Sequence, residues 1–513
     1  MVGMIPRPVH LQNCLPDAKF PSGGTIQVTQ ISRDSRQVLS GSTFVAIRGT
    51  QSDGHHYVSE AVAAGAKTVV VECPLADLSV PQVVVKSTRR AWNQLCMALH
   101  DNPQCQLTIA GITGTNGKTT TAWLLRNILV AAGHSAGMLG TVEYNDGHKR
   151  FASQLTTPDA QIQAQLMASM TNQKTRHCVM EVSSHALQQD RCSALQLSAA
   201  AITNITPDHL DYHQTSAAYC MAKARIAELL HCDAPLVLNE DDPGIRQLLK
   251  DTVFSCPVIT FGQQATSELR YSVLTRTHRS QRLRLALAQG DIAVRVRLIG
   301  DHNAANCMAA ASLAEQLGID LPSIIAGLEA TREVPGRLER IDEGQPFQVF
   351  VDYAHTPDAL RNCLATVRAF THGNLICVFG AGGERDHSKR PAMAQAAAVA
   401  DRVFLTSDNP RSESPNQIID EILEGFSTRH HVDVDMDRQA AIRRALQVAE
   451  PGDAVVLAGK GHEQLQVLGT RSVAFDDRQV ARQILTELTS SLRNVTAEET
   501  GPPQTPGLLT FPV

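Results

Sequence analysis

The feature that most constrains the fold of this chain is a glycine-rich turn, residues 111–120, placed between an apolar strand and an amphipathic helix. The strand is expected at residues 107–112. The helix carries an apolar stripe made of Leu124, Leu125, Ile128 and Leu129. Strand and helix patterns go on alternating to about Val334, which is typical of a parallel sheet covered by helices.

The 513 residues are too many for one hydrophobic core, and the chain divides into blocks. We expect an N-terminal α/β domain at 1–103, a central parallel-sheet domain at 104–336 and a C-terminal doubly wound, Rossmann-like domain at 337–495. The pair Pro335-Gly336 is a natural turn and hinge. The tail at 496–513 is rich in Pro, Thr and Gly and is expected to be disordered.

The composition excludes several classes of protein. A formal net charge of −5 argues against a surface that binds nucleic acid or an anionic membrane throughout. No apolar run approaches the roughly 18 residues needed to span a bilayer, and the N-terminus lacks a signal-peptide pattern. The 12 cysteines are scattered without a Cys-x-x-Cys pair, so neither a zinc site nor a disulfide framework is indicated. We expect a cytoplasmic monomer that binds no nucleic acid and no membrane.

The glycine-rich turn has the chemistry of a phosphate-binding loop. Glycines let backbone N–H groups curl around phosphate oxygens, and the N-terminus of the following helix adds positive potential. Lys118 could reach the β- and γ-phosphates of ATP, and the Thr119 hydroxyl could bind Mg²⁺. Ile112 stands where the strict motif has a glycine. A turn that binds nothing is the alternative, and the loop alone would also fit a kinase or an NTP-driven motor.

Two further strand ends carry ionisable residues. Glu181 ends an apolar strand, where a parallel sheet presents its ligands, and could hold Mg²⁺. The alternative for Glu181 is to cap the next helix. A strand at 200–205 runs into residues 208–213, which hold four ionisable groups including His209, and a surface turn is the alternative there. Nothing local distinguishes Lys223 from an ordinary surface lysine.

Three strand ends in the last third of the chain suit an amino-acid substrate. Arg411, held by Pro410, follows one strand and could clasp a carboxylate with two parallel hydrogen bonds. Arg385 lies in a glycine-rich turn after a second strand, and Glu463 follows a third. Two Arg and one Glu suit a zwitterion with an extra carboxylate. By itself, the Asp-Asn-Pro sequence is also typical of an ordinary type I turn.

From about Ser32 to Asp477 the chain resembles the Mur ligases. Six motifs follow in the order of that family, at residues 114–120, 181–185, 204–209, 300–306, 335–339 and 352–358. The resemblance implies an ATP- and Mg²⁺-dependent ligase that joins meso-diaminopimelate to UDP-N-acetylmuramoyl-L-alanyl-D-glutamate (UDP-MurNAc-L-Ala-D-Glu) through an acyl phosphate. It also implies three α/β domains that hold the UDP-linked substrate, ATP and the amino acid, in that order.

The resemblance assigns residues to each ligand. ATP would be bound by Gly114, Thr115, Asn116, Gly117, Lys118, Thr119, Thr120, Asn303, Arg337 and Asp352. Mg²⁺ would be held by Thr119, Glu181, His209 and Lys223 as a carbamate, and the catalytic set would be Lys118, Glu181, His209 and Lys223. His209 is also a candidate base for the incoming amine.

The other two substrates have their own sets. The UDP-muramoyl dipeptide would be contacted by Arg33, Ser35, Thr50, Gln51, Ser52, Thr156, Thr157, Ser183, Gln189 and Arg191. Diaminopimelate would be contacted by Arg385, Asp408, Asn409, Pro410, Arg411, Gly459 and Glu463. The Asp-Asn-Pro-Arg tetrad is similar to the diaminopimelate-recognition motif of this family, and lysine-adding members do not carry its Arg.

Several other functions stay open on the sequence. A Mur-type ligase could add L-lysine or act at another step. A folylpolyglutamate synthetase shares the loop and the chemistry but should lack the Asp-Asn-Pro-Arg tetrad. A P-loop kinase or a transporter ATPase has no use for a third α/β domain with an amino-acid pocket. A regulatory ATP-binding module without catalysis is the remaining alternative.

Overall fold

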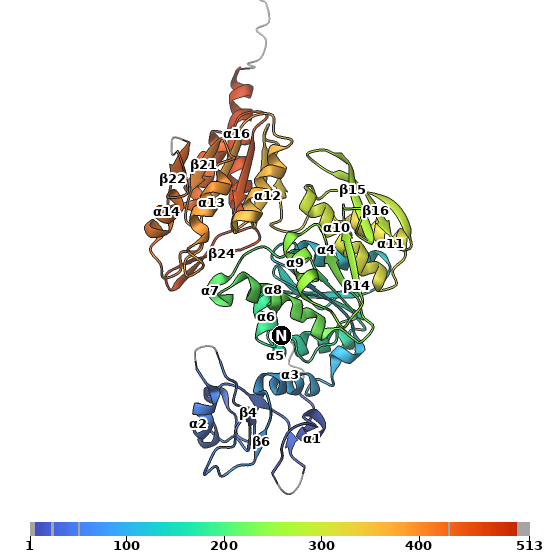
Figure 1. The fold of residues 1–513 in the computed structure, drawn as a ribbon. Coiled ribbons are helices and arrows are strands. Elements are labelled where there is room, and N and C mark those ends of the chain that lie inside the picture. Colours follow the sequence, from blue (N-terminus) through green and yellow to red (C-terminus); the bar gives the residue numbers. More distant parts are fainter. Residues whose placement is uncertain (1–5, 22–24, 50–51, 429–430, 500–513) are drawn as a thin grey trace, which may run out of the picture. The chain divides into compact units, whose positions relative to one another are not determined.

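The computed structural model describes residues 6–21, 25–49, 52–428 and 431–499. The chain divides into two compact units, Met1–Val334 and Pro335–Val513, and each unit is built from sheets covered by helices (Figure 1). Within those described ranges, no helix combines the length and the hydrophobicity that crossing a bilayer requires.

The first part of unit 1 is built on a small parallel sheet. Its strands pair in the order β3 (Ile31–Ser32), β4 (Thr43–Val45), β5 (Thr68–Val71) and β6 (Gln82–Val84). Around it lie β1 (Val9–His10), β2 (Gln27–Val28), α1 (Leu11–Cys14), α2 (Val58–Ala63) and α3 (Thr88–Ala98), with 3-10 turns at Ser35–Gln37, Gly54–Tyr57 and Pro103–Gln106. Alternate residues of β5 enter different cores, Val70 one and Val69 and Val71 the other. Both faces of the sheet are therefore covered, as parallel strands require.

The second part of unit 1 is an eleven-stranded sheet in the order β10-β9-β8-β11-β7-β12-β13-β14-β15-β16-β17. The strands are β7 (Thr108–Thr113), β8 (Ala136–Leu139), β9 (Glu143–Asn145), β10 (Arg150–Ala152), β11 (His177–Glu181), β12 (Ala199–Ile202), β13 (Leu236–Asn239), β14 (Val258–Gly262), β15 (Leu269–Arg276), β16 (Gln281–Leu287) and β17 (Gly290–Val296). The seven strands from β8 to β15 in the sheet order pair in parallel. In the centre, β7 pairs with β11 and β12 so that Glu181 lies opposite Ile112 and Ile202 opposite Thr113. The carboxyl ends of these three strands thus share one edge.

Helices cover both faces of this sheet. On β7, Ile109 packs into one core, whereas Ala110 and Ile112 pack into the other. The second core is filled by α4 (Lys118–Ala131), α10 (Asp301–Gln316) and α11 (Leu321–Ala330). The remaining helices are α5 (Ala160–Asn172), α6 (Ser184–Gln188), α7 (Leu210–His213), α8 (Ser216–Ala224) and α9 (Pro243–Asp251), with a 3-10 turn at Arg225–Leu229.

The expectation of a parallel sheet up to Val334 is wrong at the two edges. β16 pairs antiparallel with β15 and β17, and β9 pairs antiparallel with β8 and β10. The connections between these strands are too short to hold the crossover that parallel pairing needs. In β16, buried Leu283 and Leu285 alternate with exposed Arg282 and Arg284, the pattern of a sheet with one solvated face.

Unit 2 is a doubly wound α/β domain. Its sheet order is β18-β19-β23-β20-β21-β22, and only β18 among these strands is antiparallel to its neighbour. The strands are β18 (Glu339–Ile341), β19 (Gln348–Asp352), β20 (Leu375–Phe379), β21 (Arg402–Leu405), β22 (Val432–Val434) and β23 (Ala454–Ala458). The hairpin β24 (Leu465–Leu468) and β25 (Arg471–Ala474) stands apart from this sheet.

Two sets of helices cover the sheet of unit 2 (Figure 1). One set, α15 (Arg438–Gln447) and α16 (Asp477–Glu499), shares a core with alternate residues of the strands, such as Val349, Val351 and Ile376. The other set is α12 (Pro357–Arg368), α13 (Lys389–Ala397) and α14 (Pro415–Leu423), whose members pack in sequence against one another. α16 runs past Thr496, where the sequence suggested that the tail begins, and residues 500–513 lie outside the described part.

The predicted fold class is confirmed: the chain is α/β, with a parallel sheet around the phosphate loop and a doubly wound domain after Pro335. The three domain boundaries expected from the sequence stay a prediction.

Candidate functional site

The glycine-rich turn lies between β7 and α4 and is shaped by close contacts. Gly114 and Gly117 have φ angles of 149° and 83°, which other residues rarely adopt. A Cβ at Gly114 would lie 1.9 Å from Thr203 Oγ1, and one at Gly117 would lie 2.3 Å from Asn306 Oδ1. Only glycine fits at either position. The turn therefore presents backbone N–H groups at the N-terminus of α4, as a phosphate-binding loop does.

Two lysines converge on this loop. Lys118 Nζ donates to the carbonyl oxygens of Gly114 and Thr115 at 2.8 and 2.9 Å, and Lys223 Nζ donates to the same Gly114 oxygen at 2.8 Å. Lys223 is only 1 % exposed and lies 4.4 Å from the centre of the Tyr219 ring. It is not an ordinary surface lysine, because α8 directs it inward beneath the loop.

Burial and, secondly, the charge of Lys118 hold the pKa of Lys223 well below its usual range. A lysine in such a place tends to lose its proton. The neutral amine is the form that can react with CO₂, so the environment suits the carbamate that the family resemblance implies.

Glu181 ends β11 beside the loop and is completely buried. Its Oε2 accepts hydrogen bonds from the hydroxyls of Thr119 at 2.9 Å and Thr141 at 2.8 Å, and its Oε1 accepts from the Thr141 backbone N–H at 2.8 Å. It does not cap the next helix, because Ser183 is the N-cap of α6. A hydroxyl and a carboxylate 2.9 Å apart are hard oxygen donors of the kind Mg²⁺ prefers, so this pair fits that ion.

His209 lies in the segment after β12 and has a positive φ of 55°. Its Nε2 lies 3.5 Å from Asp208 Oδ2, and its ring centre is 4.9 Å from that of His185. Thr115 Oγ1 donates to the Thr206 carbonyl at 2.9 Å, which ties this segment to the phosphate loop. Asp208 is buried, so the segment is no simple surface turn.

Four of the residues expected to contact the UDP-muramoyl dipeptide form one network. The Ser183 N–H donates to Thr157 Oγ1 at 2.9 Å, and Thr157 Oγ1 donates to the Glu181 carbonyl at 2.8 Å. Arg191 donates to Gln189 Oε1 through Nε and Nη2, at 2.9 and 2.6 Å, and to the Thr157 carbonyl through Nη1 at 3.3 Å. This network therefore begins at the same strand end as the proposed metal ligand.

The remaining members of that set lie nearby or outside the described chain. Arg33 pairs with Asp159 at 2.9 Å and lies over the Trp92 ring. Ser35 is buried in its 3-10 turn, Thr156 Oγ1 lies 3.1 Å from Thr141 Oγ1, and Ser52 is exposed. Thr50 and Gln51 lie outside the described residues.

Asn303 connects to the phosphate loop through a second asparagine. Its Nδ2 donates to the Ile299 carbonyl at 2.8 Å, and its Oδ1 accepts from Asn306 Nδ2 at 3.1 Å. Asn306 in turn contacts the loop at Gly117 and accepts from Thr121 Oγ1 at 3.4 Å. Asn303 and Thr120 are both buried in unit 1.

Arg337 and Asp352 meet in unit 2. Asp352 accepts hydrogen bonds from the N–H groups of Leu338 at 2.6 Å and Ala354 at 2.8 Å, and burial raises its pKa. The Arg337 guanidinium lies 4.4 Å from the centre of the Tyr353 ring. The two residues expected to reach the nucleotide from this unit thus sit on adjacent loops.

The amino-acid candidates of unit 2 also converge. Asn409 Nδ2 donates to Glu463 Oε2 at 2.7 Å, and a Cβ at Gly459 would lie 2.6 Å from Asp408 Oδ2. These contacts join the segments after β21 and β23. Burial and the charge of Asp408 raise the pKa of Glu463.

Arg411 is fixed by its backbone and its side chain. It has a φ of 54°, its N–H donates to the Val467 carbonyl at 3.1 Å, and its carbonyl accepts from the Gly469 N–H at 2.7 Å. Its Nη1 donates to the Gly383 carbonyl. The turn is therefore anchored to the hairpin β24–β25 and to the glycine-rich segment that carries Arg385, which is itself exposed.

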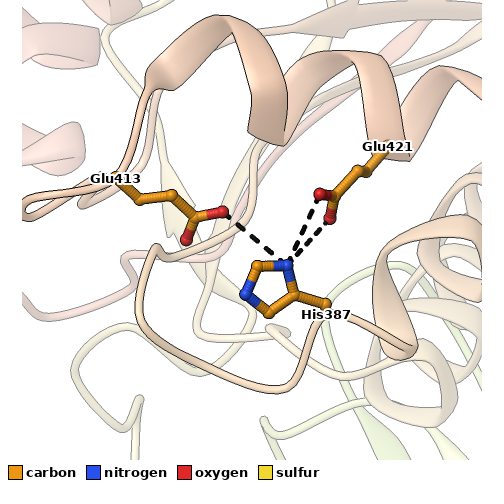
Figure 2. Close-up of side chains that lie close together, drawn as sticks. All are labelled: His387, Glu413 and Glu421. Carbon is orange, nitrogen blue, oxygen red and sulfur yellow. Dashed lines mark hydrogen bonds and ion pairs between the residues drawn. The ribbon is translucent and has the colours of Figure 1, made fainter.

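A charged cluster adjoins the Arg411 turn through Glu413, which stands two residues after Arg411 in the chain. Figure 2 shows His387 between Glu413 and Glu421, 3.1 Å from a Glu421 oxygen and 3.7 Å from a Glu413 oxygen. The fully buried Arg390 pairs with both carboxylates, at 2.6 Å to Glu413 and 2.7 Å to Glu421. His387, Glu413 and Glu421 could hold a metal by their ligand atoms alone, but Arg390 already supplies the balancing cation.

This cluster supports the two loops of the amino-acid candidates. Glu413 Oε2 accepts from the Glu384 N–H at 2.9 Å and from Arg390 Nη2 at 2.8 Å. Hydrogen bonds from Arg390 lower the pKa of Glu413 to about 2. An ionised Glu413 thus links the turn of Arg411 to the segment of Arg385.

Sequence reasoning missed two residues of these sites. Thr141 makes two of the hydrogen bonds that hold Glu181, yet it follows β8 and stands in no motif. Its contact with Glu181 depends on the pairing of β8 with β11 in the sheet, which no sequence motif marks. Lys460 lies between the assigned residues Gly459 and Glu463 but was itself not assigned, although it is completely buried against Asn409 and Glu463.

Fold and sites together define a class: nucleotide-binding α/β proteins in which a P-loop sheet is followed by a doubly wound domain. Comparison with known protein families identifies one family within this class. Residues 27–101 match the Mur ligase family, catalytic domain, residues 112–314 match the Mur ligase middle domain, and residues 336–461 match the Mur ligase, glutamate ligase domain.

Individual relatives agree. A UDP-N-acetylmuramoyl-L-alanyl-D-glutamate–2,6-diaminopimelate ligase of Geobacillus kaustophilus is 41 % identical over 92 % of this chain and 98 % of its own length. The enzyme of the same name from Aquifex aeolicus is 39 % identical over 90 % of this chain and 94 % of its own. The chain belongs to the Mur ligase family, as the sequence resemblance indicated.

Solved structures give the same fold. A structure of a UDP-N-acetylmuramoyl-L-alanyl-D-glutamate–2,6-diaminopimelate ligase aligns with a TM-score of 0.67 and 30 % identity, over 94 % of this chain and all of the other. A folylpolyglutamate synthase of Mycobacterium tuberculosis aligns over 72 % of this chain and 92 % of its own, with a TM-score of 0.61 and 22 % identity. The second likeness concerns the fold alone.

Proposed function

We propose that this protein is an ATP-dependent ligase that joins meso-diaminopimelate to UDP-MurNAc-L-Ala-D-Glu in the synthesis of peptidoglycan precursors. The observation that carries the proposal is the anchored Arg411 turn, joined through Asn409 to Glu463. A guanidinium after β21 and a carboxylate after β23, at the carboxyl ends of parallel strands of one sheet, suit an amino acid that has an ammonium group and a second carboxylate. The relatives described above carry the same activity in their names.

The first chemical step takes place at the phosphate loop. A carboxylate oxygen of the D-glutamyl residue attacks the γ-phosphorus of ATP, the bond to the bridging oxygen breaks, and ADP leaves. Charge spreads over the transferred phosphoryl oxygens in this transition state. Lys118, which in this structure donates to loop carbonyls, would turn its donors to those oxygens. Water must be kept from the acyl phosphate until the amine attacks it.

In the second step, a neutral amine of diaminopimelate attacks the acyl carbon. The tetrahedral adduct then expels phosphate and leaves an amide, and the amine gives up a proton. His209 is the candidate acceptor of that proton, because its ring lies in the segment tied to the phosphate loop and close to His185. The amine must reach the acyl carbon, and motion about a hinge at Pro335-Gly336 would allow this approach. That hinge, expected from the sequence, stays a prediction.

Mg²⁺ would be held by the oxygen and nitrogen donors around the loop: Thr119, Glu181, His209 and the carbamate of Lys223. When bound, the ion neutralises phosphate charge during phosphoryl transfer. Carbamylation would turn the Lys223 amine into an oxygen ligand like a carboxylate. Thr141 keeps the Glu181 carboxylate aimed at the loop by two hydrogen bonds.

Diaminopimelate would be held at both ends in unit 2. Arg411 and Arg385 would pair with its far carboxylate, and Asp408 and Glu463 would receive its ammonium group. L-lysine lacks the far carboxylate, so the same pocket should bind it more weakly.

Product identity tests the proposal directly. Purified protein is incubated with ATP, Mg²⁺, UDP-MurNAc-L-Ala-D-Glu and meso-diaminopimelate, and the products are analysed by mass spectrometry. A new UDP-linked tripeptide, formed in equal amount with ADP, is expected. ADP formed without that tripeptide would instead support an ATPase or a kinase.

A further inference from the structure

Lys460 is a buried charge beside the proposed amino-acid site. It follows β23 in the segment 459–463, and its side chain is 0 % exposed. An ammonium group removed from water is costly unless it is paired and hydrogen-bonded. Its partners therefore indicate why a lysine is kept here.

Its ammonium group donates to three oxygens. They are Asn409 Oδ1 at 3.2 Å, Glu463 Oε2 at 3.1 Å and the Leu465 carbonyl at 2.8 Å. An ammonium has three protons, so all its donors are used. Two of the three acceptors belong to side chains assigned above to diaminopimelate.

These bonds fix which way the Asn409 amide faces. Its Oδ1 accepts from Lys460 and also from the Val467 N–H at 2.9 Å, so its Nδ2 must face the other way, where it donates to Glu463 Oε2 at 2.7 Å. Lys460 and Asn409 thus both act on Oε2. Among the described residues no hydrogen bond ends on Oε1, which leaves that oxygen to accept from a bound ammonium group.

Charge acts in the same direction as geometry. Burial and Asp408 raise the pKa of Glu463, whereas Lys460 lowers it. The other charged or titratable groups that interact with Glu463 are Tyr353 and Arg438. Without Lys460, the half-buried carboxyl group of Glu463 would face the buried one of Asp408 without a cation between them, and one of the two would tend to take up a proton.

We infer that Lys460 is a positioning residue for the amino-acid substrate, which aligns Asn409 and the Glu463 carboxylate so that Oε1 receives the substrate's ammonium group. The inference rests on the proposed function, because it takes this cluster as the amino-acid site. Lys460 itself, with its three donors occupied, does not touch the substrate.

The experiment is a double-mutant cycle in the full-length protein, with ADP release as the readout. The variants are Lys460→Met, Glu463→Gln, the double variant, and Lys250→Met as an exposed control. Lys460→Met should raise the KM for diaminopimelate roughly tenfold or more, the cost of leaving a buried polar group unpaired, with little change in the KM for ATP. The double variant should be no worse than Glu463→Gln alone, because Lys460 acts through Glu463.

A pH profile adds a readout that a merely structural role would not move. Loss of Lys460 should raise the pKa of Glu463, so the acid limb of kcat/KM for diaminopimelate should move to higher pH. An unmoved limb, effects that multiply in the double variant, or an equal rise in the KM for ATP would overturn the inference. The double variant takes the place of Lys460→Met if that variant does not fold, because residues 460 and 463 are then both neutral. Equal KM values for diaminopimelate in the double variant and in Glu463→Gln would still show that Lys460 acts through Glu463.

The wild-type protein separates this inference from the proposed function. If it does not use diaminopimelate, the proposed function fails. The same cycle is then run with whichever amino acid supports ADP release, and the selective rise in that substrate's KM still tests Lys460.

Discussion

Lys118 and Lys223 donate to one and the same acceptor, the carbonyl oxygen of Gly114, each at 2.8 Å. Two ammonium groups so close repel each other, and this repulsion adds to the burial that lowers the pKa of Lys223. Lys223 is thus poised to become neutral, whereas Lys118 is the lysine assigned to phosphate. The two residues are alike in chemistry but are assigned opposite roles by their surroundings.

Replacement of Lys118 tests the phosphate loop. Lys118→Ala should lower ADP release by roughly 10²- to 10³-fold or more, because a charge donor to the transferring phosphoryl group is lost. The melting temperature should change little, since Lys118 is only half-buried and its hydrogen bonds to the Gly114 and Thr115 carbonyls lie within its own loop. Lys250→Ala serves as the control. Near-normal ADP release from Lys118→Ala would refute the assignment of the loop.

Replacement of Lys223 tests the carbamate. Removal of CO₂ and bicarbonate from the assay should reduce ADP release, and added bicarbonate should restore it, because the carbamate forms from the neutral amine. Lys223→Met should be weakly active and indifferent to bicarbonate. The measurement is ADP release across a bicarbonate series, together with a ¹³C resonance from labelled CO₂ in the wild type only. Activity that ignores CO₂ in the wild type would contradict the role.

Replacement of Arg411 tests amino-acid recognition. Arg411→Ala should raise the KM for diaminopimelate on the order of 30-fold or more, the loss expected for a paired charge, while the KM for ATP stays nearly unchanged. Alanine also carries a Cβ, so the positive φ of 54° is not relieved by the change. Arg411→Lys keeps the charge but not the forked donors and should recover only part of the affinity. Equal changes in both KM values would mark Arg411 as structural.

The Arg390–Glu413 pair gives a prediction about pH and stability. The folded protein lowers the pKa of Glu413 to about 2 from the ordinary 4.5, so the stability from this pair is complete above pH 4.5 and is lost as the pH falls towards 2. Glu413→Gln should lower the free energy of unfolding at pH 7 by about 3 kcal/mol, because Arg390 is left buried without its main partner.

Urea unfolding at several pH values measures this effect. The gap between wild type and Glu413→Gln should be constant from pH 7 to about pH 5 and should narrow below pH 4.5. A gap that stays constant down to the lowest pH at which both proteins fold would show that ionisation of Glu413 does not contribute.

Much of the fold could be predicted because its signals are local. The turn at 111–120 shows its glycines, its lysine and its flanking strand and helix within a few residues, and the strands of unit 2 are short apolar runs. The antiparallel edge was also visible, since Leu283 and Leu285 alternate with arginines. The prediction missed this edge because it extended the strand–helix alternation of the preceding residues, and with it the parallel sheet, as far as Val334.

The parts that could not be predicted depend on which face of an element meets which neighbour. Lys223 lies on a helix whose sequence does not show that its lysine face turns to the loop. Thr141 and Glu181 are 40 residues apart in the chain. They meet only because β8 and β11 are neighbours in the sheet. The role inferred for Lys460 depends on the direction in which the Asn409 side-chain amide faces, and no sequence pattern predicts that direction.

The central claim is that an acyl phosphate made at the Lys118 loop is captured by an amine whose far carboxylate is docked by Arg411. The most direct measurement compares ADP release by the wild-type protein with UDP-MurNAc-L-Ala-D-Glu and either meso-diaminopimelate or L-lysine. The account predicts a kcat/KM for diaminopimelate at least roughly 100-fold higher than for L-lysine, since one charged docking contact separates the two substrates. Equal kcat/KM values for the two amino acids would contradict it.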